Sequence, residues 1–563
     1  MAHLYTDPHT VERMTGLSLK GSMTMPTQDH DRRFFLPAVL SVAGRDYFLV
    51  REIDTANVAA CGFTRMPVVP FSPYWRARPA AAMPRTAADA VLSLLRTERL
   101  TVDAATPALV YEQLRANIPV EVEPAVSRPV RAFRLHRADV LGRFNHHRKE
   151  IAEVAQRLTA GHPHADRLAP WLEERPNPAF HLLDQMSAGR GLSALLATWV
   201  TNFQELSGLR GTLAETEGCA SLFVLGADEV WILAPASLDL DLAGPAQEYP
   251  GLPDAVRDIA GQGPVGFERD ALGAAHLLEL RERGVQLEDA GLLLRDWREE
   301  KAWLDVPYFI VGALASRHAI EGAAHFAGQA IRAGVEVTER DVDRVYRSLL
   351  REFEAEHRLP VRLEIYFTNN HAGSRTILPS RPTRYPLSAG STTLKIDCGV
   401  FVVDDGLFHA CTDIARTVTT TRNATEVFQA MEQAVVEEII PGIRVGMTGE
   451  QIHALGVDRM AEREVVFRTH GFMPDDFSWR TGYTRDVGHV IERQESYTFY
   501  FRPGTARPLR PGMVSCVEIH CVDDGHNLTI EDTFVADKTG TIIISRIPEE
   551  FGPDGKVTRR PQR

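Results

Sequence analysis

Apolar and polar positions in the first 300 residues form the same pattern twice. Near the start, VERMTGLSLKG (11–21) precedes AVLSVAGRDYFLV (38–50), and further on NFQELSGLRG (202–211) precedes SLFVLGADEVWILAP (221–235). In both places a helix-like segment that ends at a Gly-Leu is followed by two β-rich runs around a polar turn, which is the signature of a β-hairpin. The repetition predicts a duplicated structural unit.

The two units also end alike. Residues 126–155 correspond to residues 290–315, because each stretch places an arginine-bearing segment before an amphipathic helix. The proline-rich, polar stretch 159–180 is typical of a connection between domains. A chain of 563 residues is too long for one hydrophobic core. Length alone therefore predicts three or four domains. We place boundaries near residues 160 and 305, which gives the ranges 1–160, 161–305 and 306–563.

Two further hairpins are predicted in the last third of the chain. The sequence CGVFVVDDGLFHACT (398–412) places Asp-Asp-Gly between two β-rich runs, and a second Asp-Asp-Gly separates strand-like segments 514–522 and 527–535. This tripeptide is a strong hairpin signal. In the first hairpin, two antiparallel strands would bring Asp397 and Asp413 to the same end of a sheet, with Asp404 and Asp405 at the tip.

Five potential metal ligands lie within apolar, strand-like runs of this region, where an unpaired charge is costly. Four carboxylates and one imidazole form an oxygen-rich set, which suits Mn²⁺ and related divalent ions better than a closed thiolate zinc site. Bridging carboxylates could hold two ions about 3.5–4 Å apart. The set comprises Asp397, Asp413, His489, Glu518 and Glu531. Two alternatives stay open, namely a salt-bridged structural pair at Glu518 and Glu531, and Asp404 or Asp405 as a ligand in place of Asp413.

These segments resemble the metallopeptidase family of methionine aminopeptidase, X-prolyl aminopeptidase, prolidase and creatinase, which share the pita-bread fold. The resemblance covers roughly residues 310–545 and includes VVEEIIPGIRVGMTGEQIHAL (435–455), RPGMVSCVE and IEDTFVADKTGTIIISRIP. With the duplicated N-terminal pattern, it resembles X-prolyl aminopeptidases of the three-domain type. The fold class it implies is mixed α/β and α+β, with a C-terminal pita-bread domain after two creatinase-like N-terminal domains.

The resemblance also implies a chemistry. It predicts two divalent metal ions, with manganese expected and zinc, iron or cobalt as alternatives, held by the five ligands. Glu518 would accept a proton from the attacking water, and His489 would act in the same centre. Relatives are commonly homodimers, so a homodimer is expected here.

The sequence departs from the family immediately after His489. The family has a second histidine seven residues after the first, beside the scissile carbonyl of a peptide, whereas Ser496 stands there in GHVIERQES. With a two-residue deletion, Gln494 and Glu495 would take the place of the family's His-Glu, and Gln494 could still donate a hydrogen bond. Ordinary aminopeptidase activity is therefore in question.

Further substrate-binding candidates lie upstream of Asp397. His371 is the one histidine available to match a substrate-facing histidine of the family, although it lies 26 residues before Asp397. Arg375 and Arg381 could bind a substrate carboxylate through bidentate hydrogen bonds, or could be solvated loop residues. Arg416 is expected to pair with a nearby acid.

Composition narrows the class of protein. The formal charge of −13 argues against binding to nucleic acid or to an anionic membrane. The apolar run 306–315 is about half a membrane span and predicts a buried helix, and the N-terminus shows no secretory signal. Six scattered cysteines without a CxxC pair fit reduced thiols in a cytoplasmic protein. Cys398 and Cys516 lie near predicted ligands, and we interpret them as apolar packing residues rather than catalytic thiols.

The leading hypothesis is a cytoplasmic, dinuclear-metal hydrolase that cleaves a C–N bond of a small peptide or peptide-like substrate. The first alternative is a non-peptidase enzyme of the same fold, either a creatinase-like hydrolase or a lyase acting on a small metabolite. The second is a catalytically silent binding protein. Fold resemblance alone does not decide among them.

Overall fold

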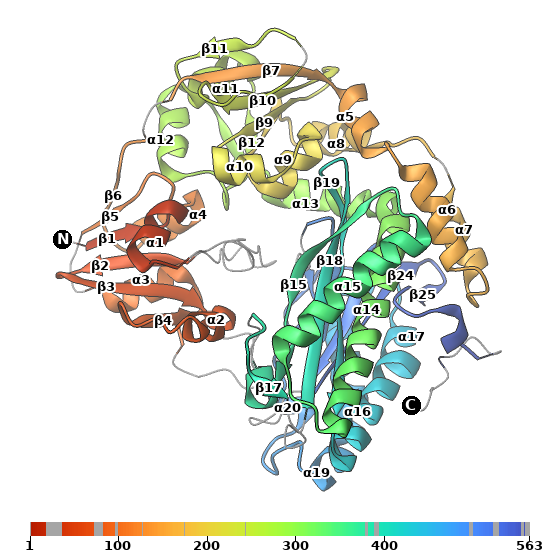
Figure 1. The fold of residues 1–563 in the computed structure, drawn as a ribbon. Coiled ribbons are helices and arrows are strands. Elements are labelled where there is room, and N and C mark those ends of the chain that lie inside the picture. Colours follow the sequence, from red (N-terminus) through yellow and green to blue (C-terminus); the bar gives the residue numbers. More distant parts are fainter. Residues whose placement is uncertain are drawn as a thin grey trace.

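The computed structural model describes residues 2–17, 37–71, 83–95, 99–125, 128–173, 175–242, 244–377, 381–387, 393–494, 499–521, 528–552 and 557. The chain forms two N-terminal units, each around one sheet, and a C-terminal part that contains the metal-ligand candidates (Figure 1). In this view the first unit lies at the left in red, the second at the top, and the C-terminal part at the lower right in green to blue.

The first sheet has six strands in the order β4-β3-β2-β1-β5-β6. These strands are β1 (Ala2–Tyr5), β2 (Ala38–Val42), β3 (Arg45–Arg51), β4 (Val68–Phe71), β5 (Leu100–Val102) and β6 (Val120–Val122). The helices of this unit are α1 (Pro8–Thr15), α2 (Thr55–Ala60), α3 (Ala87–Leu94) and α4 (Ala108–Arg115). The hairpin predicted at 38–50 is confirmed by β2 and β3, which pair antiparallel.

The second sheet has seven strands in the order β11-β7-β10-β9-β8-β12-β13. They are β7 (Val130–His136), β8 (Ala194–Ala197), β9 (Ala220–Val224), β10 (Glu229–Pro235), β11 (Gln247–Tyr249), β12 (Val265–Phe267) and β13 (Leu287–Asp289). The helices of this unit are α5 (Arg137–Phe144), α8 (Ala179–Ala188), α9 (Val200–Ser207), α10 (Thr212–Glu217), α11 (Leu252–Ala260), α12 (Ala274–Glu282) and α13 (Gly291–Glu300). Helices α6 (Arg148–Leu158) and α7 (Ala165–Leu172) follow α5 in the chain but pack against α14 (Val306–Ala333) of the C-terminal part. The hairpin predicted at 221–235 is confirmed by β9 and β10.

Five strands of each sheet share one order and one set of directions. The order β3-β2-β1-β5-β6 in the first sheet corresponds to β10-β9-β8-β12-β13 in the second. In both, the first two pairings are antiparallel and the last two are parallel. This is the repeated arrangement that the sequence pattern predicted.

The outer strands differ. In the first sheet β4 runs parallel to β3, whereas in the second sheet β7 runs antiparallel to β10. Strand β7 comes from residues 130–136, so it precedes the expected boundary at residue 160 although it pairs in the second sheet. The three domain ranges stay predictions.

The two N-terminal units share one hydrophobic cluster, which joins residues of β1 and β5 to residues of β8 and β9. Their backbones also meet directly, because Pro107 and Gly273 form an isolated antiparallel bridge. A Cβ atom on Gly273 would lie 2.7 Å from the carbonyl oxygen of Ala104. Glycine is therefore required at this contact.

The C-terminal part contains two larger sheets, one in which β18 pairs with β15, β16, β19 and β20, and one in the order β22-β21-β23-β24-β25. The strands are β14 (Val337–Thr338), β15 (Arg362–Thr368), β16 (His371–Ala372), β17 (Pro386–Leu387), β18 (Thr393–Asp404), β19 (Leu407–Cys411), β20 (Ile414–Thr419), β21 (Gly488–Ile491), β22 (Phe499–Tyr500), β23 (Val514–His520), β24 (Thr529–Asp537) and β25 (Gly540–Ile543). The helices are α14 (Val306–Ala333), α15 (Glu339–His357), α16 (Arg422–Gln433), α17 (Ile440–Gly442), α18 (Gly449–Ala461), α19 (Glu464–Thr469) and α20 (Trp479–Gly482), with a π-helical turn at Ala434–Ile439.

Helix α14 lies in the core of this part. Its first turns, which include the apolar run 306–315, are buried against β18, α15 and α6. The prediction of a buried helix is thus confirmed. Among the residues that the structure describes, no helix is long and apolar enough to span a membrane.

Both hairpins predicted in this part are present. The first turns at Asp405-Gly406, where both residues have positive φ (46° and 79°), as a type I′ turn requires. The second pairs β23 with β24 in antiparallel register, and its turn, with Asp523, lies outside the described residues.

Buried ion pairs join the C-terminal part to the second unit. Immediately after β21, Glu492 accepts a hydrogen bond from Arg298 of α13 at 2.6 Å. Arg493 contacts Glu205 of α9 at 2.8 Å and makes two bonds of 2.8 Å to Asp305. Because all five side chains are buried, the contact fixes the end of β21 against the second unit.

We expect Arg493→Met to lower the free energy of unfolding by about 3–5 kcal/mol, because buried Asp305 loses this partner and Glu205 keeps only its ion pair with Lys301 at 2.7 Å. Arg422→Met is the control, since that side chain is 90% exposed and lies 3.6 Å from Glu426. An exposed pair of this kind contributes about 0.5 kcal/mol or less. Thermal and urea unfolding of both variants would check this, and equally small effects would contradict it.

Candidate metal centre

The five predicted ligands come from neighbouring strands of the two C-terminal sheets. Asp397 lies in β18 and Asp413 in the short link between β19 and β20. His489, Glu518 and Glu531 lie in β21, β23 and β24, which are adjacent in one sheet, and Glu518 stands directly opposite Glu531. The two sheets are tied together at this point, because Thr533 Oγ1 donates to the Asp413 carbonyl at 3.2 Å.

Four of the five side chains converge on one buried point. Oxygen atoms of Asp397, Asp413 and Glu531 all lie within 4.8 Å of one another. His489 Nε2 lies 3.7 Å from Asp413 Oδ2 and 3.7 Å from Glu531 Oε1. Asp413, rather than Asp404 or Asp405, therefore faces Asp397, as the lengthened hairpin predicts.

The backbone at His489 approaches its neighbour closely. Gly488 has a φ of 145°, and a Cβ atom there would lie 2.1 Å from the Cys516 carbonyl oxygen. A side chain at position 488 would collide with this oxygen, so only glycine fits. Glycine allows β21 to pair with β23, and this pairing places His489 beside Glu531.

The carboxylates repel one another in a site that water does not reach. Burial, and next the charges of Asp397 and Glu518, raise the pKa of Asp413 well above its usual range. Burial and the charge of Asp413 raise the pKa of Glu531 in the same way. Burial also raises the pKa of Asp397, although Lys395 acts in the opposite direction. The raised pKa values reflect burial together with the mutual repulsion of the carboxylates, which the positive charges in the site do not fully offset.

Lys395 is the cation nearest to Asp397. Its Nζ donates to Asp397 Oδ2 at 3.0 Å, and the side chain is 1% exposed. Asn369 Nδ2 donates to the same oxygen at 3.3 Å. Lys395 precedes Asp397 by two residues in β18, so the strand places both side chains on one face.

Glu518 is held differently from the other acids. Burial alone would raise its pKa, but His520 and Arg485 outweigh this and lower the pKa below its ordinary value. His520 Nε2 lies 2.6 Å from Glu518 Oε1, and Arg485 Nη2 lies 3.5 Å from Oε2. Glu518 is therefore ionised without any added ion, which argues against a simple structural pair with Glu531.

His489 is a neutral imidazole at ordinary pH, because burial lowers its pKa to about 4. A neutral imidazole is the form that binds a metal ion. The thiol of Cys516 lies 3.2 Å from His489 Nε2, so this cysteine borders the centre. Cys398 points to the other face of β18, where its thiol contacts Asn370 Oδ1 at 3.2 Å.

The donor atoms fit a divalent cation. Asp413 Oδ2, Glu518 Oε2 and both carboxylate oxygens of Glu531 are buried and accept no hydrogen bond within the part of the chain that the structure describes. Lys395 and Arg485 provide two positive charges against four carboxylates, so two negative charges stay uncompensated. A divalent ion coordinated by these oxygens would supply the missing charge.

Buried ion pairs on the other side of β24 fix the backbone at Glu531. Arg416 donates to the Asp532 carboxylate at 2.6 Å and to the Glu531 carbonyl at 2.5 Å, and Arg546 binds the same carboxylate at 2.8 Å. The expectation that Arg416 pairs with an acid is confirmed. Since Asp532 follows Glu531 in β24, its side chain points to the opposite face and anchors the strand.

The structure places the remaining predicted residues at different positions around the centre. His371 is buried in β16 directly opposite Lys395. Gln494 is buried near Gly211 of the second unit, and its Nε2 has no hydrogen-bond acceptor among the described residues. Arg375 Nε donates to Glu339 at 2.9 Å, and its Nη2 donates to the carbonyl of Arg381, which is exposed. Ser496 and Glu495 lie outside the described residues. The substrate-binding roles of these residues stay predictions.

Four further residues border the centre. Sequence reasoning placed Cys516 near a predicted ligand but missed Lys395, His520 and Arg485. Lys395, Cys516 and His520 each lie two residues from a predicted ligand in a strand, and the two-residue period of a strand puts such neighbours on the same face. The fourth, Arg485, lies outside any strand and reaches Glu518 through the tertiary fold.

Comparison with known families agrees with this geometry. Residues 314–538 match the model of metallopeptidase family M24. This segment contains all five candidate ligands, and the match agrees with the pita-bread fold that the sequence led us to expect. A search among curated proteins found none that matches the chain.

A solved structure with a TM-score above 0.5 has a similar fold, and two more match part of the chain. The X-prolyl aminopeptidase from Caenorhabditis elegans, described as a cytosolic enzyme with a di-nuclear active site, has 11% identity and a TM-score of 0.58, over 95% of this chain and 83% of that one. The Xaa-Pro dipeptidase from Bacillus anthracis has 17% identity and a TM-score of 0.47, over 65% of this chain and 97% of its own. The prolidase from Pyrococcus furiosus has 16% identity and a TM-score of 0.44, over 65% and 99%.

The raised carboxyl pKa values predict a pH-dependent response to metal. Groups whose pKa is raised by folding stabilise the metal-free protein at low pH, and this contribution is lost as pH rises through the raised pKa values of Asp413 and Glu531. A metal ion binds the deprotonated carboxylates, so its affinity increases over the same window, above about pH 4. The increase in melting temperature on adding Mn²⁺ should therefore grow from acidic to neutral pH.

Differential scanning calorimetry with and without Mn²⁺ across this range would measure the effect. In Glu531→Gln the strongly raised carboxyl is replaced by an amide of similar size, and we expect a smaller and flatter response. An Mn²⁺-induced shift that is independent of pH in the wild-type protein would show that these carboxyls do not bind the ion.

Proposed function

We propose that this protein is a dinuclear-metal hydrolase of the X-prolyl aminopeptidase type, which cleaves a C–N bond of a small peptide or peptide-like substrate. The observation that supports this best is the convergence of Asp397, Asp413, His489 and Glu531 in a buried site with unpartnered carboxylate oxygens. The match of residues 314–538 to a metallopeptidase family points to the same chemistry.

In this proposal the five side chains hold two divalent ions, which when bound would activate water and polarise a carbonyl group. Asp397, with Asp413 and Glu531, forms one set of oxygens, and His489 with Asp413 and Glu531 forms the other. Glu518 is the candidate proton acceptor, because His520 and Arg485 keep it ionised. His520 in turn contacts Thr529 Oγ1 at 3.0 Å, so the imidazole is fixed on both sides.

Manganese as the native ion, with zinc, iron or cobalt as alternatives, belongs to the proposal because the donor set is rich in oxygen. A homodimer and a cytoplasmic location are also proposed. The six cysteines support the latter, since all are free thiols.

A non-peptidase reaction on the same fold is the second candidate. The segment after His489, where the family has its second histidine, is used here for buried contacts with the second unit through Glu492 and Arg493. Gln494 provides an Nε2 donor that has no acceptor among the residues that the structure describes. A substrate other than a standard peptide is therefore a specific alternative, with His371 and Gln494 as candidate contacts.

Steady-state kinetics on Gly-Pro and longer X-Pro peptides with Mn²⁺ would test the proposal. The absence of a histidine donor at a developing oxyanion costs about 2.7–4 kcal/mol, which is a hundred- to a thousand-fold in rate. We expect slow but measurable X-Pro cleavage that Asp413→Asn and Glu531→Ala abolish, together with lower metal content. Asp458→Asn, an exposed aspartate of α18 paired with Arg480, should leave both unchanged.

Two outcomes of these kinetics would decide between the candidates. A kcat/KM above about 10⁴ M⁻¹s⁻¹ on X-Pro peptides would remove the non-peptidase alternative. No cleavage of X-Pro peptides by a protein that contains its metal ions would contradict the peptidase proposal and favour small amides as substrates.

The position of Lys395 predicts that the ion beside Asp397 binds more weakly than the other. Its ammonium group lies 3.0 Å from Asp397 Oδ2, and so repels an ion bound to that carboxylate. We expect Lys395→Met to raise the affinity for the second Mn²⁺ about tenfold or more, which is ~1.4 kcal/mol. Lys395→Arg keeps the charge and is the matched control. Isothermal titration calorimetry measures both, and equal second-ion affinities in the two variants would contradict this role.

A further inference from the structure

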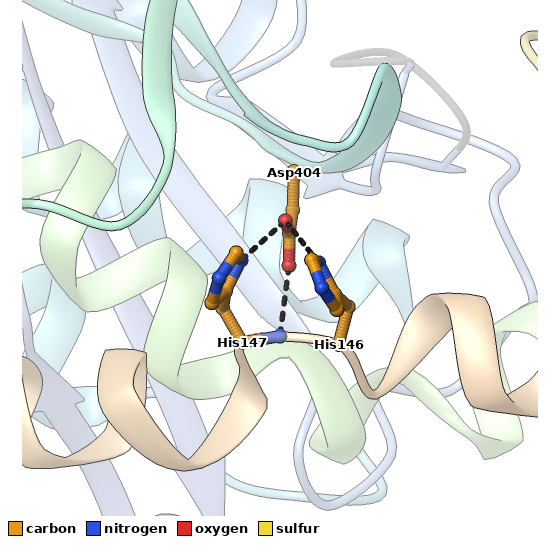
Figure 2. Close-up of side chains that lie close together, drawn as sticks. All are labelled: His146, His147 and Asp404. Atoms are coloured by element: carbon orange, nitrogen blue, oxygen red, sulfur yellow. Dashed lines mark hydrogen bonds and ion pairs between the residues drawn. The ribbon is translucent and has the colours of Figure 1, made fainter.

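A cluster of two histidines and one aspartate lies outside the proposed catalytic centre. His146 and His147 form the turn between α5 and α6, and Asp404 ends β18 at the tip of the hairpin. His147 Nδ1 lies 2.8 Å from Asp404 Oδ1, and His146 Nδ1 lies 3.5 Å from the same atom. Figure 2 shows the two imidazole rings on either side of the carboxylate.

The three donor atoms have the spacing of a metal site. Two ligand atoms at about 2.0–2.1 Å from a tetrahedral ion lie roughly 3.3 Å apart. Both His–Asp separations lie within about half an ångström of this value, and one atom from each of the three residues can be chosen so that all lie within 4.8 Å. Small rotations of the histidine rings would thus be enough to admit an ion.

The carboxylate is fixed before any ion binds. Asp404 is 1% exposed, and its Oδ2 accepts a hydrogen bond from the His147 backbone N–H at 3.1 Å. Oδ1 is left to face the two imidazoles (Figure 2). A ligand that is oriented by a hydrogen bond of this kind loses little freedom on binding metal.

An open cavity of about 320 Å³ adjoins the cluster and leaves room for water as a fourth ligand. Besides the cluster, its charged lining residues are Arg210, Arg362, Glu364 and Asp405. Three carboxylates and two arginines thus line this cavity, and the excess of acidic side chains favours a cation.

We propose that His146, His147 and Asp404 bind one divalent ion of the zinc class. Two imidazoles and one carboxylate are the ligands that Zn²⁺, Cu²⁺ and Ni²⁺ prefer, in contrast to the oxygen-rich set at Asp397. The two sites are distinct, because Asp404 lies seven residues from Asp397 along an extended strand, roughly 23 Å. The ion would clamp the turn between α5 and α6 to the hairpin whose strands hold Asp397 and Asp413. This proposal does not depend on the proposed function.

The test is zinc uptake by the full chain after its other sites have been loaded with Mn²⁺. The wild-type protein and the double variant His146→Ala/His147→Ala are equilibrated with chelator-buffered Zn²⁺, and bound zinc and manganese are measured by mass spectrometry. We expect the wild type to bind about one more zinc ion per chain than the variant, with equal manganese. Cu²⁺ should show nitrogen hyperfine coupling in its electron paramagnetic resonance spectrum, and the double variant should lose it.

Two further variants make the result specific. His181→Ala/His325→Ala removes two exposed histidines that each contact a glutamine four residues later, and it should bind as much zinc as the wild type. Asp404→Asn keeps the size of the buried side chain and should weaken zinc binding about tenfold or more. Equal zinc uptake by the wild type and the His146→Ala/His147→Ala variant would show a hydrogen-bonded junction without metal affinity and would overturn the proposal.

Discussion

The burial of four carboxylates at one point is the constraint on which the C-terminal part of this protein depends. Asp397, Asp413, Glu518 and Glu531 are each at most 5% exposed, so their mutual repulsion has to be balanced within the fold. Lys395, Arg485 and His520 balance part of it. A divalent cation bound by these carboxylates would supply the remaining positive charge, as the proposed function requires.

The strands that present these acids are held from behind by a second set of charges. Asp532 points away from the centre and binds Arg416 and Arg546, and Arg416 also reaches the Glu531 carbonyl. Because side chains alternate along β24, Glu531 faces the centre, whereas Asp532 faces the opposite side and anchors the strand. Because the network is buried, β24 cannot slide in register without leaving several charges unpaired.

The segment after His489 couples the centre to the N-terminal units. Glu492 and Arg493 pair with residues of α9 and α13 and with Asp305, and Gln204 of α9 exchanges two hydrogen bonds of 3.0 Å with the backbone of Phe408. This is also the segment in which the chain departs from the pattern of the family it resembles. Glu492 and Arg493, which lie between His489 and the position of the departure, form an internal interface here.

The sequence by itself determined the hairpins and the repeated N-terminal pattern, and it pointed to the four side chains that converge in the structure, Asp397, Asp413, His489 and Glu531. Asp-Asp-Gly turns, glycine at position 488 and acids within apolar runs are local signals, and each depends on a few adjacent residues. The positions of Lys395, Cys516 and His520 could also have been predicted from the sequence, because the two-residue period of a strand puts them on the same face as the ligands. Only the tertiary structure decided which charges meet. Arg485 with Glu518, Arg493 with Asp305, and His147 with Asp404 are separated by 33 to 257 residues, and ion pairs of this kind leave no periodic trace in a sequence.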